Sequence, residues 1–195
     1  MKRVNGKELM MMDDKERYQQ LDKIHMFIAI RRTKDNTENC NAKKIHRRLI
    51  YNEEYDLEII KRQCEAEGDI WRIYHTVNAR DIQKALNRKD DKKNFRHIMV
   101  DTLRTDIESL WRKELLQRYN RGEKKYMLDI DAKDTKILDE CKQLVGDNFL
   151  NLYPSPNGYH MVIKPTDVRL FEDVADVTVL KDGYYHVTTV GKKNE

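Results

Sequence analysis

The sequence predicts an α+β fold, in which a mostly antiparallel sheet is flanked by helices. Helical and strand patterns are mixed along the 195 residues without regular alternation. Two alternating strands occur close together between Lys125 and Pro165, and two more follow near the C-terminus. Doubly wound proteins instead repeat strand and helix in succession, so this order is not typical of that class.

The composition indicates a heavily charged surface. Charged residues make up 37% of the chain, and the mean hydropathy of −0.88 leaves no segment of transmembrane length. The net charge of +4 permits a nucleic-acid partner without requiring one. Cys40, Cys64 and Cys141 are odd in number and far apart, which favours a reducing compartment over a disulfide framework or zinc site. The N-terminus lacks an apolar signal region, so we expect a cytoplasmic protein that does not associate with membranes.

We expect one compact unit in which an N-terminal helical and hairpin extension, 1–68, packs on a core formed by 69–195. In the extension the patterns predict a polar helix over 13–22, a strand over 25–30, a polar loop over 33–43, a strand over 47–51 and a helix between Asn52 and Gly68. In the core they predict a strand over 69–77, a short helix over 79–87 capped by Asn78, a long helix over 94–119, a helix from Asp134 to Gly146, and a closing hairpin of 176–180 and 184–190.

The first candidate site is the strand that contains Asp129 and Asp131. Because side chains alternate along a strand, both carboxylates lie on one face with Met127, about 7 Å apart. Carboxylate oxygens suit Mg²⁺ or Mn²⁺, and Mg²⁺ usually takes one or two protein carboxylates together with substrate phosphates. Alternatively, the strand ends at Asp131 and both acids are simply solvated, with Asp134 as the better cap for the next helix.

A second candidate site follows the turn Pro154-Ser155-Pro156-Asn157-Gly158, in which Asn-Gly favours positive φ. The strand over 159–164 then places His160, Val162 and Lys164 on one face. A histidine and a lysine beside a turn with free backbone N–H groups can bind a triphosphate. Alternatively, His160 forms a hydrogen bond within its own turn.

Basic residues gather around the predicted polar loop. They are Arg31, Arg32, Lys43, Lys44, Arg47 and Arg48. Such a cluster forms either a solvated face or a contact with a phosphate backbone.

Taken in order, these motifs resemble the archaeo-eukaryotic primase superfamily. Asp-Ile-Asp lies on one strand, Ser-Pro-Asn-Gly-Tyr-His leads into a second, and a carboxylate lies on a third. The resemblance covers roughly 70–190, and many small members of the superfamily are encoded by phages and plasmids. It implies a primase–polymerase catalytic core with an RRM-like, mostly antiparallel sheet, acting in a bacterial or phage-infected cell.

The resemblance also implies roles for individual residues. The catalytic metal ions, Mg²⁺ or Mn²⁺, would be held by Asp129, Asp131 and a third carboxylate, for which we choose Asp176 over Asp173 and Asp182, the last being more simply a turn residue. Nucleotide contacts would come from Ser155, Asn157, Gly158, His160 and Lys164. Template contacts would come from Arg72, Arg80 and the basic loop.

We therefore expect template-directed nucleotidyl transfer by two metal ions, with nucleoside triphosphates and single-stranded or primed DNA as substrates. A replicative helicase is a candidate partner. Two other classes stay open. A metal-dependent nuclease would use the same residues without nucleoside triphosphates, and a catalytically inactive module of the same fold would bind nucleotide or nucleic acid without turnover. A ligase-like enzyme is not indicated, because Lys181 directly precedes Asp182 instead of standing two residues before it.

Overall fold

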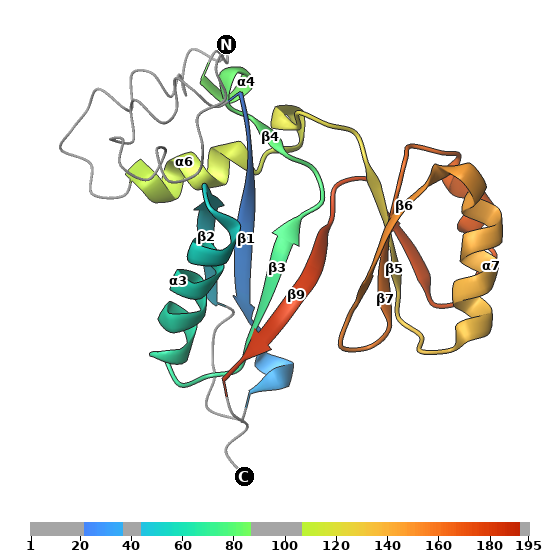
Figure 1. Ribbon diagram of the computed structural model, residues 1–195, viewed down its shortest axis with the longest axis horizontal. Coiled ribbons are helices and arrows are strands. Elements are labelled where there is room, and N and C mark those ends of the chain that lie inside the picture. Colours follow the sequence, from blue (N-terminus) through green and yellow to red (C-terminus); the bar gives the residue numbers. More distant parts are fainter. Residues whose placement is uncertain (1–21, 37–43, 87–106, 192–195) are drawn as a thin grey trace.

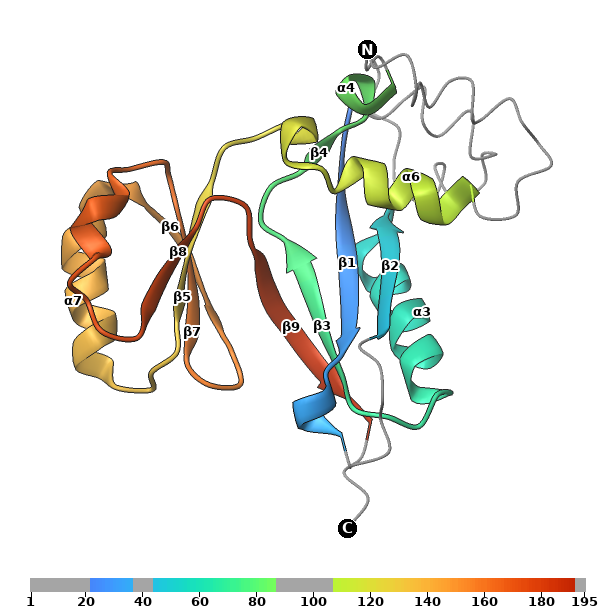
Figure 2. The ribbon, with the colours of Figure 1, turned by 180° about the vertical axis from the view of Figure 1, so that it is seen from behind.

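Two antiparallel sheets make up the described part of the protein, which is residues 22–36, 44–86 and 107–191 of a computed structural model. Figures 1 and 2 show the sheets side by side, with helix α3 (Glu53–Glu65) outside the first and helix α7 (Thr135–Val145) outside the second. The predicted α+β class with antiparallel sheets and flanking helices is confirmed. Within the described ranges, every helix is too short or too polar to cross a lipid bilayer.

The first sheet has the strand order β2-β1-β3-β9, and β4 pairs with β1. Its strands are β1 (Lys23–Arg31), β2 (Lys44–Ile50), β3 (Trp71–Thr76), β4 (Arg80–Asp81) and β9 (Tyr184–Val190). The short helical segments around it are η1 (Thr33–Asp35), α4 (Ile82–Leu86), α6 (Ile107–Leu115) and η2 (Arg118–Asn120). Strand β1 is buried on both faces, because Phe27 and Ala29 join the cluster beneath α3 while Ile24 and Met26 pack with Trp111 of α6.

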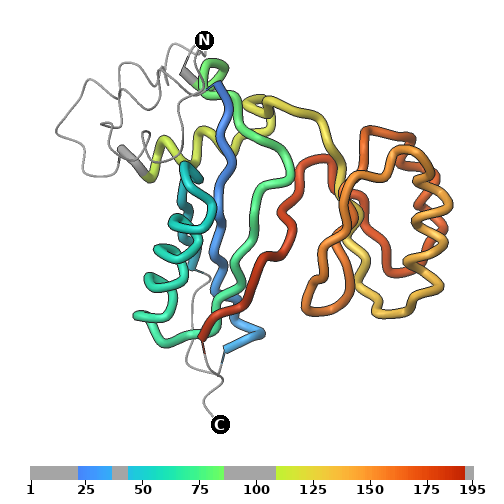
Figure 3. The backbone as a smooth tube through the Cα atoms, viewed as in Figure 1, coloured from blue at the N-terminus to red at the C-terminus, as the bar shows by residue number. Residues whose placement is uncertain are grey.

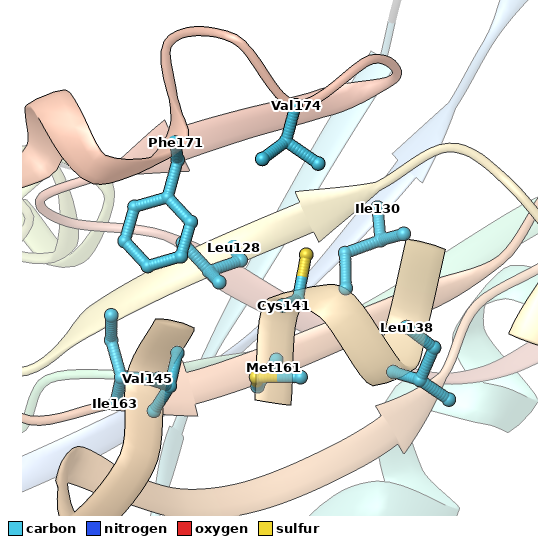
Figure 4. Packing of buried hydrophobic residues seen from close by; sticks show 9 residues of the cluster. All are labelled: Leu128, Ile130, Leu138, Cys141, Val145, Met161, Ile163, Phe171 and Val174. Atoms are coloured by element: carbon cyan, nitrogen blue, oxygen red, sulfur yellow. The ribbon is translucent and has the colours of Figure 1, made fainter. Parts of the chain in front are cut away.

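The second sheet has the order β6-β7-β5-β8, with β5 (Tyr126–Ile130) near its centre. After β5 come α7, η3 (Gly146–Asn148), β6 (Phe149–Pro154), β7 (Tyr159–Ile163), η4 (Val168–Phe171) and β8 (Val177–Leu180). Leu128 and Ile130 of β5 pack beneath α7 with Cys141, Met161 and other apolar side chains (Figure 4). This burial leaves Met127 and Asp129 on the opposite face of the sheet, as the strand alternation predicts.

The chain passes from the first sheet to the second through 121–125 and returns through 181–183 (Figure 3). A buried polar cluster joins the two crossings. The Asn78 amide donates to the Lys125 carbonyl at 3.0 Å and accepts from the Lys125 N–H at 2.7 Å. Arg80, fully buried, makes two hydrogen bonds to the carboxylate of Asp182, at 2.8 and 3.1 Å. Removing one partner of such a buried ion pair typically costs about 3–5 kcal/mol, so this cluster fixes how the sheets connect.

Several predicted elements are confirmed, with small shifts at their ends. Strands β1 and β2 pair as antiparallel neighbours. The side chain of Asn52 caps α3 by accepting from the Tyr55 N–H, and Asp134 caps α7 by accepting from the Lys136 N–H. Of the long helix predicted over 94–119, residues 107–115 are helical, and 94–106 lie outside the described residues. The helix predicted over 13–22 and most of the loop over 33–43 also lie outside them.

Other expectations were wrong. The predicted closing hairpin does not form, because β8 pairs with β5 while β9 pairs with β3 in the other sheet. Asn78 does not cap the next helix, since β4 intervenes and the Asp81 carboxylate accepts from the Lys84 N–H. Strand β6 was not predicted, and β1 pairs directly with β3 across the expected boundary at residue 68. The described part of the extension therefore belongs to the first sheet instead of packing on a separate core.

Candidate active site

A pocket of about 450 Å³ is lined by residues of both sheets. From the first sheet and η1 come Ile30, Arg32, Lys34, Arg72, Tyr74 and Tyr184. From the second sheet and the loops beside it come Met127, Asp129, Asp131, Ser155, Pro156, Asn157, His160, Leu180, Asp182 and Gly183. The first set contributes cations and aromatic rings, and the second contributes carboxylates and a histidine, so the pocket has opposite charges on its two sides.

Asp129 and His160 are the central pair of this pocket. They are direct partners on the antiparallel strands β5 and β7, which places their side chains together on one face. The Nε2 atom of His160 lies 3.2 Å from Oδ1 of Asp129. The histidine side chain is only 8% exposed and the aspartate side chain is 32% exposed, so the carboxylate retains access to the pocket.

The ring of His160 is held in one tautomer by the other sheet. The backbone N–H of His186, on β9, donates to Nδ1 of His160 at 2.8 Å. Because a backbone amide can only donate, Nδ1 carries a lone pair, and the proton of the neutral ring is on Nε2. His160 therefore presents an N–H donor toward Asp129 and the pocket.

The surroundings of His186 keep that residue neutral. Burial lowers the pKa of its imidazole, and the charge of Arg72 lowers it further. The His186 ring also lies within hydrogen-bond distance of Thr189 Oγ1, at 3.0 Å. The strand segment that orients His160 therefore carries no positive charge of its own near neutral pH.

Asp131 lies just beyond β5, and its backbone N–H donates to the Asp176 carbonyl at 2.9 Å. The nearby turn is tied into the same corner, because the Gly158 N–H donates to Ser155 Oγ at 3.0 Å and the Ser155 N–H donates to the Gly158 carbonyl at 2.9 Å. These two N–H groups are therefore not free for phosphate, contrary to the prediction. Neither Asn157 nor Gly158 has positive φ. Glycine is required at 158 because a Cβ there would lie 2.1 Å from the Ile130 carbonyl oxygen.

The structure separates other predicted site residues from the pocket. Lys164 lies beyond the far end of β7, roughly 13 Å along the strand from His160, and its side chain is exposed. Asp176 and Asp173 are exposed and do not line the pocket. Asp182 does line it, but both of its carboxylate oxygens accept hydrogen bonds from Arg80.

The two arginines predicted to contact a template differ in accessibility. Arg72 lines the pocket and forms an ion pair with Asp35, Nη2 to Oδ1, at 2.5 Å. Arg80 has no exposed surface and is committed to Asp182, so the prediction that it contacts a template is wrong. Sequence reasoning missed Tyr74 and Tyr184 as pocket residues. The alternation of β3 could have identified Tyr74, because it shares a face with Arg72.

The carboxylates fit a divalent cation that binds together with a phosphorylated substrate. Among the described residues, no group of three or more His, Cys, Asp or Glu side chains is placed to hold a metal ion. Asp129 and Asp131 are the two pocket carboxylates that Arg80 does not engage. Two carboxylates are what Mg²⁺ usually takes from a protein when phosphates and water supply its remaining ligands.

The sequence matches no protein-family model, no curated protein and no solved structure. The chemistry of the pocket is therefore the basis for assigning a function.

Proposed function

We propose that this protein catalyses template-directed nucleotidyl transfer from nucleoside triphosphates, as primase–polymerases do. The observation that carries this proposal is the Asp129–His160 pair, in which the histidine presents a hydrogen-bond donor to a carboxylate-lined pocket. In this structure the Nε2–H of His160 points at Asp129 Oδ1, so a bound phosphate oxygen would share that N–H with Asp129 or take its place. The histidine would thus position the triphosphate beside the carboxylates.

The same observation favours a polymerase over a nuclease. A histidine that acts as a general base or a metal ligand needs a lone pair on the nitrogen that faces the substrate. In His160 that nitrogen is Nε2, which carries the proton, while the lone pair on Nδ1 is occupied by the His186 N–H. A base or ligand role would require that inter-sheet hydrogen bond to break.

The distribution of charge across the pocket supports a nucleotide substrate. Asp129 and Asp131 would hold Mg²⁺ or Mn²⁺, which when bound neutralises the triphosphate and activates the attacking 3′-hydroxyl. Arg72 lies on the facing side of the pocket, where its guanidinium can contact the phosphates. The ring of Tyr184 provides apolar surface on which the base of the nucleotide can stack.

The connectivity of the second sheet supports the RRM-like core in this proposal. Its elements follow the order strand, helix, strand, strand, 3₁₀ turn, strand, and β5 and β7 are adjacent within the sheet. This is the split βαβ arrangement, with η4 standing where a second helix would be. In such a sheet the adjacent inner strands carry the proposed site.

The test measures nucleotide affinity and primer extension with Mn²⁺ and a primed DNA template. His160→Ala should weaken nucleotide binding about ten- to hundredfold and slow extension, because a phosphate contact is lost. Lys164→Ala is the matched control, since it removes a polar side chain from the end of the same strand outside the pocket. If the wild-type protein bound no nucleotide even with the primed template, the polymerase proposal would be wrong.

A second candidate is an inactive binding module of the same fold. It is favoured by the lack of a third accessible carboxylate in the pocket as lined by the described residues, where Asp176 is outside and Asp182 is paired with Arg80. Such a module would bind nucleotide in a His160-dependent manner and yield no extended primer.

A further inference from the structure

A second cavity, of about 430 Å³, adjoins the carboxylate pocket. It is lined by Ile30, Arg32, Thr33, Lys34 and Tyr74. All but Thr33 also line the carboxylate pocket, so the two cavities share a wall. The lining contains cations, a hydroxyl and an aromatic ring, with no carboxylate among the described residues that form it.

Four cations of the first sheet already form an ion pair with a carboxylate. The ion pairs are Arg31–Asp69 at 2.7 Å, Lys44–Glu67 at 2.8 Å, Arg48–Asp56 at 2.6 Å and Arg72–Asp35 at 2.5 Å. Arg32 is less engaged, because its Nε lies 4.0 Å from the nearest Asp35 oxygen. Lys34 has no carboxylate partner in the described ranges. Arg32 and Lys34, the two cations of the second cavity, are therefore less committed to carboxylates than these four residues.

We propose that this second cavity binds a single strand of nucleic acid on its way to the carboxylate pocket. Arg32 and Lys34 contact backbone phosphates, and Tyr74, which lines both cavities, stacks on a base. The proposal rests on the proposed function only in naming that strand as the template.

The chemistry of the cavity selects this ligand over two others. A nucleoside triphosphate brings a divalent cation, and the described lining offers no carboxylate to hold one. A duplex keeps its bases stacked on each other, whereas a tyrosine ring can stack only on a base of an unpaired strand. A single phosphodiester strand needs no divalent cation and has unpaired bases, so it fits this cavity on both counts.

The first experiment measures the affinity of a fluorescent ten-residue oligothymidylate at several salt concentrations, in EDTA and without nucleotides. Arg32→Gln and Lys34→Gln should each weaken binding and reduce the slope of log affinity against log salt by about one. Lys44→Gln is the matched control, because it removes the same charge from a lysine that is paired with Glu67 and lies outside both cavities. Equal slopes for all three variants would overturn the proposal.

The second experiment tests the stacking contact. Tyr74→Ala should weaken oligonucleotide binding about five- to hundredfold, because the ring is lost, whereas Tyr74→Phe should retain most of the affinity. Equal losses in the two variants would contradict stacking. A duplex or thymidine monophosphate that binds as tightly as the oligonucleotide would contradict the single-strand assignment.

The two proposals fail separately. Since the oligonucleotide assay contains no metal and no nucleotide, a failure to bind the strand would overturn the second-cavity assignment while Mn²⁺-dependent nucleotide binding could still be observed. Strand binding without nucleotide binding would instead leave the second cavity assigned and refute the polymerase.

Discussion

At the scale of single residues, the carboxylates of Asp129 and Asp131 are not tied up in ion pairs that hold the fold together. Asp129 accepts from one histidine, and the side chain of Asp131 is exposed. Asp129→Asn and Asp131→Asn should therefore abolish Mn²⁺-dependent nucleotidyl transfer and change the melting temperature little, because each removes a charge without changing shape. Activity assays and thermal unfolding check this, with Asp173→Asn as the control at an exposed acid outside the pocket. A large fall in melting temperature would indicate that the acids are structural.

Much of the site at this scale could be predicted from the sequence. The alternation of β5 and β7 predicts which face of the sheet holds Asp129 and His160, because the side to which a side chain points depends only on its position along its own strand. Alternation does not show which end of a strand meets the pocket, so Lys164 was expected beside a pocket that it does not line. Local sequence also does not reveal that Arg80 and Asp182 pair across 102 positions, so one was predicted to be an exposed contact and the other a simple turn residue.

At the scale of elements, local signals identified strands and caps, while pairing partners depended on the whole chain. Residues 177–180 and 184–190 were recognised as strands from their alternation. Their short connection was taken as a hairpin turn, but the Gly183 carbonyl accepts from the Val77 N–H and leads the chain into the other sheet. Strand β6 was not predicted, because Pro154 and the residues after it give a strong turn signal at its end.

The turn between β6 and β7 gives an element-scale prediction. In Gly158→Ala, the new Cβ would lie 2.1 Å from the Ile130 carbonyl oxygen and 2.6 Å from that of Ala132, and backbone atoms cannot move aside cheaply. We expect a loss of about 1–3 kcal/mol in unfolding free energy together with weaker nucleotide binding, because the turn and Asp131 shift. Urea unfolding and nucleotide titration measure the two effects.

Gly122→Ala is the matched control for this change. The Cβ added at 122 would meet only the flexible side chain of Lys23, at 3.0 Å, away from the pocket. A similar loss in both variants would show that close approach to β5 is not what requires glycine at 158.

At the scale of the whole molecule, a stack of rings connects the two sheets. The ring centroids of His25 and His75 are 4.6 Å apart, and those of His75 and Tyr185 are 4.9 Å apart. The ring of Tyr185 in turn lies 3.8 Å, between centroids, from that of Tyr153 of the second sheet. The Nδ1–H groups of both histidines donate to the Thr76 carbonyl. A neutral, partly buried ring stack therefore contributes to the contact between the sheets. Through this contact the His186 N–H of β9 donates to His160.

This stack predicts that acid weakens the folded protein. Burial, followed by the charge of His75, lowers the pKa of His25 from 6.5 to about 4. The unfolded state therefore binds more protons between these values, so the contribution of His25 is fully present above pH 6.5 and is lost as the pH falls toward 4. The loss should reach about 3 kcal/mol, from 1.36 kcal/mol for each pKa unit. Urea unfolding at pH 7 and pH 4.5 measures it, and His25→Asn, which keeps a donor for Thr76 but does not titrate, should show a smaller difference between the two pH values. An equal difference in the variant would assign the acid sensitivity to groups other than His25.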